Sequence, residues 1–139
     1  MSTPHQATCV MIDTRGVLIE GASGAGKSSL ALALIDRGAT LVGDDGVLLE
    51  ADGAVLRASP HPAISGKLEV RNLGLIDMPV ARAVPVALVL ALDLDAPRFI
   101  DAAQTVVRAG VALPLVRLWP DAPVLALRAE LALKFYGLS

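Results

Sequence analysis

The chain has 139 residues, of which 54% are hydrophobic and 19% are charged, a balance typical of one globular domain and not of a disordered chain. Its formal net charge is −2, from 12 basic and 14 acidic side chains, so it lacks the basic field that attracts nucleic acid or an anionic membrane. We therefore expect one domain over residues 1–139, with neither nucleic acid nor a membrane as partner.

The sequence predicts neither a signal peptide nor a membrane-spanning helix. Its N-terminal residues lack a basic segment followed by an apolar one, and the longest uncharged apolar run, Ala83–Leu92, is well short of the roughly 20 residues of a membrane helix. Cys9 is the single cysteine, so it cannot form an internal disulfide, and we expect a small core residue there. A cytoplasmic protein is the expected localisation.

The first third of the chain predicts a β-hairpin followed by a helix. The apolar runs Ala7–Thr14 and Gly16–Gly21 indicate two strands joined at Arg15-Gly16. From Lys27 to Arg37 the apolar residues recur at helical spacing, and Gly38 stands where a left-handed residue ends many helices.

The middle of the chain alternates strands and turns. Ala39–Gly43 is a short apolar strand, and Asp52-Gly53 lies between two apolar runs as in a hairpin. Ser59–Gly66, with two prolines and a glycine, is expected to be a loop. The segment from Lys67 to Pro79 begins as a strand and breaks at Asn72 or Gly74.

The last third predicts a buried strand and a C-terminal helix. Val84–Asp95 is almost continuously apolar, as in a strand covered on both faces. We expect a short helix over Ala102–Ala109, a strand over Ala112–Trp119 and a helix from Asp121 to Gly137. We expect an α/β fold with mixed sheets.

The most specific motif follows the second predicted strand. It matches G-x-x-x-x-G-K-[ST] and comprises Gly21, Ala22, Ser23, Gly24, Ala25, Gly26, Lys27 and Ser28. Small residues let the backbone N–H groups surround phosphate oxygens, and the helix that follows adds its positive dipole end. In such loops the lysine reaches the β- and γ-phosphates and the serine joins Mg²⁺. The motif therefore predicts binding of a nucleotide and Mg²⁺, and by itself it identifies no particular nucleotide.

Two places could supply the carboxylate that completes this site. Asp93 ends the buried strand, as a Walker-B aspartate does, while the pair Asp44-Asp45 ends the shorter strand after the P-loop helix. Neighbouring side chains in extended chain point to opposite sides, so one of the pair could face phosphate while the other joins a supporting network. The same Asp-Asp-Gly sequence is also typical of a simple turn.

A third element favours the aspartate pair. "LEVRNLG" places Glu69 and Arg71 two residues apart on one strand face. The order of P-loop, "LVGDD" and "LEVRNLG" resembles the catalytic domain of HPr kinase/phosphorylase, with "GxxGxGKS", "ADD" and "LEIRGLG" at similar intervals, over roughly Ala7 to Met78. That family phosphorylates a serine of the phosphocarrier HPr of the phosphotransferase system and reverses the reaction by phosphorolysis.

The resemblance implies ATP as the cofactor and a role for each matched residue. Lys27 would bind phosphate, Ser28 and Glu69 would hold magnesium, and Asp45 would exchange the proton of the substrate serine. Asp44 and Arg71 would support the site. The implied fold is the phosphoenolpyruvate-carboxykinase-like type of P-loop kinase domain, in the short proteobacterial form without the N-terminal domain. HPr or its nitrogen-branch homologue would be the partner, and the chain would form an oligomer, a hexamer by family resemblance.

Some positions depart from the family pattern. Gln6 stands where the family has a catalytic histidine, with His5 one place earlier as the candidate, and Asn72 replaces a glycine. Arg117 and Arg128 are both candidates for the family's late arginine, and His61 is expected to be only a loop residue. Two other functions stay open at this point: a generic P-loop NTPase or small-molecule kinase that uses Asp93, and a nucleotide-sensing module with little catalysis.

Overall fold

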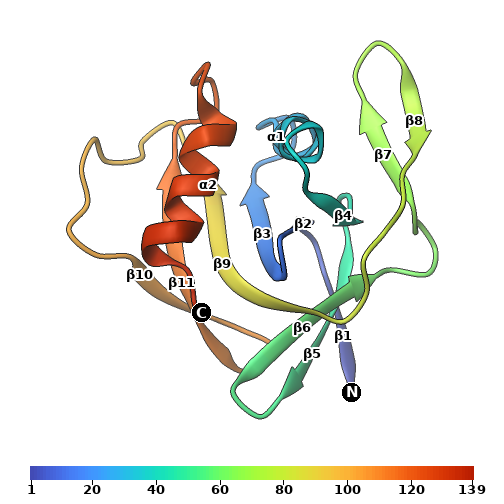
Figure 1. The fold of residues 1–139 in the computed structure, drawn as a ribbon, viewed down its shortest axis with the longest axis horizontal. Helices are drawn as coiled ribbons and strands as arrows, with labels where there is room; N and C mark the ends of the chain where they lie inside the picture. The colour runs from blue at the N-terminus through green and yellow to red at the C-terminus, as the bar shows by residue number, and fades with distance from the viewer.

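A computed structural model describes residues 1–139 as a mixed α/β fold of eleven strands and two helices (Figure 1). The strands are Ser2–His5 (β1), Thr8–Ile12 (β2), Arg15–Gly21 (β3), Thr40–Gly43 (β4), Val47–Asp52 (β5), Val55–Pro60 (β6), Lys67–Val70 (β7), Gly74–Asp77 (β8), Val84–Leu92 (β9), Gln104–Arg108 (β10) and Val111–Leu118 (β11). The helices are Lys27–Asp36 (α1) and Leu125–Tyr136 (α2). No helix is long and apolar enough to cross a bilayer.

Strand β9 joins the two parts of the main sheet. Its later residues pair in parallel with β3 on one side and β11 on the other, which gives the strand order β4-β2-β3-β9-β11-β10. Its first residues pair antiparallel with β6, through Ala58 and Val84, and so continue the sheet through β6, β5 and β1. The short hairpin of β7 and β8 forms a separate two-stranded sheet.

Two hydrophobic layers lie on the two faces of β3 and β9. Figure 1 shows α1 and α2 side by side on one face, and the hairpin of β5 and β6 below the strands. Residues alternate between the layers: Ile19 and Leu90 pack against the helices, whereas Leu18 and Val89 pack toward β5 and β6. This alternation explains the continuous apolar run of β9, which was predicted to be buried on both faces.

Most predicted elements are confirmed, α1 among them. The end of α1 has the double hydrogen bond of a Schellman motif, since Ala39 N–H donates to Leu34 O and Gly38 N–H donates to Ile35 O. Gly38 has φ of +111°, the conformation expected of it from the sequence. The Asp52-Gly53 hairpin, the buried strand β9, the strand β11 and the C-terminal helix are also present.

The expected helix over Ala102–Ala109 is wrong, because the chain forms strand β10 there and pairs antiparallel with β11. The β-branched residues Thr105, Val106 and Val107 suit a pleated strand better than a helix. Ala109 and Gly110 both have positive φ, at 47° and 82°, and they close a two-residue hairpin turn.

Some boundaries also differ from the predictions, and one strand was not predicted. The turn between β2 and β3 is at Asp13 and Thr14, since Arg15 already pairs with Ile12. Strand β6 continues to Pro60, which the sequence placed in a loop; Pro60 pairs with Val47 at the end of the β5–β6 ladder, beyond the two residues at which β9 pairs β6. Residues 2–5 form β1 along β5, a strand that the sequence did not indicate.

Candidate functional site

The P-loop lies between the end of β3 and the start of α1, the context that its motif requires. Gly26 precedes α1 with φ of +103°, a conformation that strains any residue with a Cβ. Ala25 N–H donates to Ala22 O at 3.0 Å, which turns the loop back on itself. The Lys27 ammonium donates to the carbonyls of Gly21 and Ala22 at 2.9 and 3.1 Å and so crosses the loop mouth.

A cavity of about 230 Å³ opens beside this loop. Its lining contains no hydrophobic side chain and combines P-loop residues with side chains from three other segments: Thr8, Ser23, Gly24, Gly26, Lys27, Ser28, Ser29, Asp44, Asp45, Glu69 and Arg71. The fold thus brings the P-loop, the aspartate pair and the Glu69–Arg71 pair to one place. A cavity with this lining suits a charged, oxygen-rich ligand and not an apolar one.

Asp44 is the centre of a hydrogen-bond network under the cavity. Its Oδ1 accepts from Ser28 Oγ at 2.6 Å and from Thr8 Oγ1 at 3.0 Å, and its Oδ2 accepts from Glu69 N–H at 2.9 Å. The residue is only 8% exposed, and a carboxylate so buried is stable only with such donors. Asp44 therefore ties the first helical turn of α1 to β2 and β7.

Asp45 is adjacent to Asp44 in the chain but differs from it in exposure to solvent. It is exposed, it has φ of +61°, and its N–H donates to Thr8 Oγ1 at 3.3 Å. The chain doubles back here so tightly that a Cβ on Gly43 would lie 2.5 Å from Gly46 O. The turn that the Asp-Asp-Gly sequence indicates is therefore also part of the site, because it places both aspartates in the cavity wall.

Glu69 and Arg71 reach the cavity from the end of β7. Glu69 is in the strand and Arg71 is just beyond its last residue, and both side chains are exposed. A Cβ on Gly24 would lie 4.0 Å from Arg71 Nη2, so the guanidinium is beside the P-loop. Asn72 has φ of +74° in the turn to β8, a positive φ that asparagine tolerates better than most residues.

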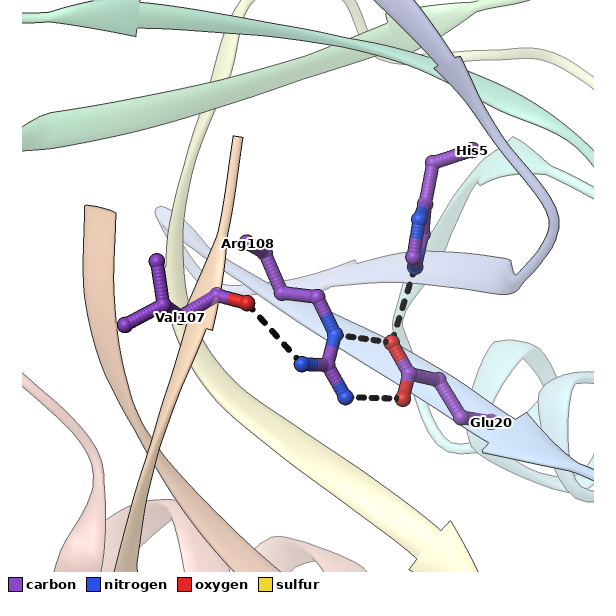
Figure 2. Close-up of polar contacts among 4 residues, drawn as sticks. All are labelled: His5, Glu20, Val107 and Arg108. Atoms are coloured by element: carbon purple, nitrogen blue, oxygen red, sulfur yellow. Dashed lines mark hydrogen bonds and ion pairs between the residues drawn. The ribbon is translucent and has the colours of Figure 1, made fainter. Parts of the chain in front are cut away.

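His5 lies outside the phosphate cavity and pairs with a carboxylate instead. Its Nε2 is 2.8 Å from Glu20 Oε2, and Arg108 donates to both oxygens of Glu20 at 2.9 and 2.7 Å (Figure 2). Figure 2 shows the three side chains converging from β1, β3 and β10. Because Glu20 directly precedes the first P-loop glycine, this cluster fixes the strand from which the loop begins.

The charges of Glu20 and Arg108 stabilise each other. Burial of Glu20 opposes ionisation, but hydrogen bonds from Arg108 and His5 outweigh burial and leave the pKa of Glu20 below its ordinary value. The hydrogen bond to Glu20 in turn raises the pKa of Arg108.

Outside this cluster, burial raises the pKa of the Cys9 thiol to about 12, against a smaller opposing effect of a backbone hydrogen bond at Val17, as expected of a core cysteine.

The other candidates lie away from the P-loop cavity. Asp93 follows β9, but its Oδ1 accepts from Asp95 N–H at 2.8 Å and its Oδ2 is 3.7 Å from Arg117 Nη1. Arg128 of α2 lies over the ring of Trp119, at 5.9 Å from its centre. None of Asp93, Arg117 and Arg128 lines the cavity.

Thr8 is a site residue that the sequence analysis missed. It is fully buried, donates to Asp44 and accepts from the Asp45 N–H, so it links the two aspartates. The signal in the sequence is a single hydroxyl in the otherwise apolar run "ATCVMI". A single hydroxyl in an apolar run is also common in strands that belong to no functional site, and only the contact with Asp44 identifies Thr8 as a site residue.

The oxygen atoms of the cavity suit magnesium. Ser28 Oγ, Glu69 and the two aspartates are hard ligands of the kind that Mg²⁺ prefers, and they adjoin the P-loop. No group of three or more His, Cys, Asp or Glu side chains converges as a ready metal cage. This arrangement fits a Mg²⁺ ion that is held by one or two side chains together with nucleotide phosphates and water.

The fold and the cavity together define a P-loop domain, and comparison with known proteins gives its family. Residues 1–83 match the family model described as HPr Serine kinase C-terminal domain. The chain belongs to this family.

Comparison with individual proteins supports this family assignment. The chain is 51% identical over 73 residues to the HPr kinase/phosphorylase of Clostridium tetani and, over an equal length, to that of Clostridium novyi; in each case the match spans 50% of this chain and 24% of the relative. The chain thus matches about a quarter of the length of these curated relatives. A structure described as the Hpr(Ser) kinase/phosphatase from Coxiella burnetii aligns with a TM-score of 0.84 and 31% identity, over 95% of this chain and 88% of the other.

Proposed function

We propose that the chain is an ATP-dependent protein-serine kinase that acts on an HPr-type phosphocarrier, and that it also catalyses the reverse, phosphate-dependent reaction. The observation that carries this proposal is the convergence of the P-loop, Asp44-Asp45 and Glu69–Arg71 on one polar cavity. Membership of the HPr kinase family supports the carrier as substrate. Residues 1–139 would then be a single catalytic domain in the cytoplasm.

Lys27 and the P-loop N–H groups would hold the β- and γ-phosphates of ATP. In our proposal, the Lys27 ammonium leaves the carbonyls of Gly21 and Ala22 and binds the phosphates as they enter. Ser28 and Glu69 would hold Mg²⁺, which neutralises charge on the phosphates when it is bound. Arg71, beside Gly24, would add a second positive charge to the phosphate side of the cavity.

Asp45 would be the proton acceptor, and Asp44 would position it. Asp45 is the exposed member of the pair and can reach an incoming hydroxyl, whereas Asp44 already accepts three hydrogen bonds. The serine oxygen attacks the γ-phosphorus, the bond from that phosphorus to the bridging oxygen breaks, and the serine proton passes to the Asp45 carboxylate. In the reverse direction, Asp45 returns the proton to the serine oxygen while inorganic phosphate takes the phosphoryl group.

We propose a positioning role for His5 instead of the catalytic role for which the sequence made it a candidate. Its Nε2 is engaged by Glu20, so we propose that it holds β1 against the P-loop strand and does not carry the reaction's proton. We also propose the phosphoenolpyruvate-carboxykinase-like type of domain. Its support is that the P-loop strand β3 has one parallel neighbour, β9, and one antiparallel neighbour, β2.

The test is phosphoryl transfer from labelled ATP and Mg²⁺ to HPr and to its nitrogen-branch homologue. We expect one carrier to gain phosphoserine, and Asp45→Asn to abolish this transfer while ATP binding stays close to that of the wild type. Asp93→Asn is the matched control and should transfer normally. ATP binding without transfer to either carrier would favour a nucleotide sensor, and loss of activity only in Asp93→Asn would favour a generic NTPase. A sizing measurement tests the expected hexamer.

A further inference from the structure

Asp45 lines a second hollow besides the phosphate cavity. This hollow has a volume of about 460 Å³, against about 230 Å³ for the phosphate cavity. Its lining comes from the end of β1, the bend after β4 and the turn after β6: Pro4, His5, Gln6, Asp45, Gly46, His61, Ala63 and Ile64. Asp45 is the only residue common to the two linings, so it borders both hollows.

The two hollows differ in chemistry. The phosphate cavity has no hydrophobic lining residue, whereas the second hollow combines Ile64, Ala63 and Pro4 with the polar side chains of Gln6 and His61. Apolar contacts together with a few polar groups are what a polypeptide segment requires, and they are less suited to a polyphosphate. The second hollow is therefore the side from which a hydroxyl on a protein can reach Asp45.

His61 has a defined hydrogen-bonding state in this hollow. Its Nδ1 accepts from Ala63 N–H at 3.2 Å. A neutral imidazole that accepts at Nδ1 carries its proton on Nε2, so His61 presents an N–H donor. His5, the other histidine of the hollow, has its Nε2 committed to Glu20 at 2.8 Å, which leaves His61 as the imidazole with a free ring donor.

We propose that this hollow, lined by Asp45 and His61, binds the serine-bearing segment of the carrier, and that the His61 Nε2–H is a specificity-determining contact to a backbone or side-chain oxygen of that segment. The inference rests on the proposed function, because it names the acceptor side of the same site. It gives His61 a role in place of the plain loop residue that the sequence indicated. The contact acts on carrier binding and not on ATP.

Two substitutions separate this role from a structural one. In His61→Asn, the amide oxygen can accept from the Ala63 N–H as Nδ1 does, so the turn is kept while the donor at Nε2 is lost. In His61→Gln, the longer side chain carries an N–H near the position of Nε2. Val55→Thr, at the far end of β6, is the matched control outside both hollows.

The experiment measures steady-state kinetics with the full chain, varying the carrier and ATP separately, together with thermal unfolding of each variant. We expect His61→Asn to raise KM for the carrier about tenfold, the loss of one good hydrogen bond, with KM for ATP and the unfolding midpoint unchanged. His61→Gln should recover part of the loss, and Val55→Thr should match the wild type.

Two outcomes would overturn the inference: wild-type kinetics in His61→Asn, or a rise in KM for ATP equal to that for the carrier. Failure of the proposed function itself is recognised separately, because the wild-type chain would then phosphorylate no carrier at all.

Discussion

Removing the Asp44 carboxylate should destabilise the fold as well as the site. Asp44→Ala leaves three donors without their acceptor: the hydroxyls of Thr8 and Ser28 and the N–H of Glu69. Ser28 borders the open cavity and can turn to water, but Thr8 is fully buried and the Glu69 N–H is partly buried. At about 1–3 kcal/mol for each buried donor left unsatisfied, we expect a loss of about 3 kcal/mol in the free energy of unfolding.

Asp44→Asn should cost less, about 1 kcal/mol, because its amide oxygen can still accept from the Glu69 N–H and its NH₂ group can donate to the two hydroxyl oxygens, so that the proton of the buried Thr8 hydroxyl is the donor left without an acceptor. The assay is urea unfolding at neutral pH followed by far-UV circular dichroism. Asp101→Ala, an exposed carboxylate, is the control and should stay within about 0.5 kcal/mol of the wild type.

A double-mutant cycle isolates the pair of Thr8 and Asp44. Thr8→Val with Asp44→Ala should cost less than the sum of the single variants, by about 1 kcal/mol, because no donor of Thr8 is then left unsatisfied. The reasoning is refuted if Asp44→Ala loses less than about 1 kcal/mol, if the Asn and Ala variants are equally stable, or if the cycle shows no coupling.

Three further predictions concern charge, reactivity and backbone conformation. Glu20→Gln should be less stable than the wild type at neutral pH, and this difference in stability should shrink as the pH falls below 4.5. The reason is that Glu20 of the unfolded chain is protonated there, whereas folded Glu20, whose pKa is lowered by Arg108, is protonated only at lower pH. Urea titrations that show a constant difference in stability would contradict this. Cys9, fully buried and with its pKa raised to about 12, should react with a thiol reagent only after urea is added, and rapid labelling of the folded chain would show that the strand opens. Asn72→Ala should be less stable than Asn72→Gly by about 1 kcal/mol, since position 72 has φ of +74°, and equal unfolding midpoints would refute the strain.

Local patterns in the sequence predicted much of the fold. The P-loop, the helix α1 and its Gly38 end depend on residues that are close in the chain, and their spacing is enough to predict them. Strand β10 was missed because the alanines at the ends of that segment favoured a helix, while the evidence for a strand comes from pairing with β11. Propensity alone could not decide between these two structures.

The site was predictable only where its parts form local motifs. The P-loop, the aspartate pair and "LEVRNLG" each have a recognisable sequence, so most residues that line the cavity could be named in advance, whereas Thr8 could not. The contact between Glu20 and Arg108 joins residues 88 positions apart, and no local pattern indicates it. The hollow shared by Asp45 and His61 was likewise out of reach, because its three segments meet only when β1 and β6 pair with β5.

The position of β9 in the chain affects when the site can form during synthesis. The family model matches residues 1–83, and β9 begins at Val84. A nascent chain that ends at residue 83 therefore holds the whole P-loop motif and both aspartates, yet β3 lacks its parallel neighbour and β6 lacks its link to β3. Residues 1–83 therefore lack the strand that joins β3 to β6, and we expect the phosphate cavity to form during synthesis only after β9 has left the ribosome.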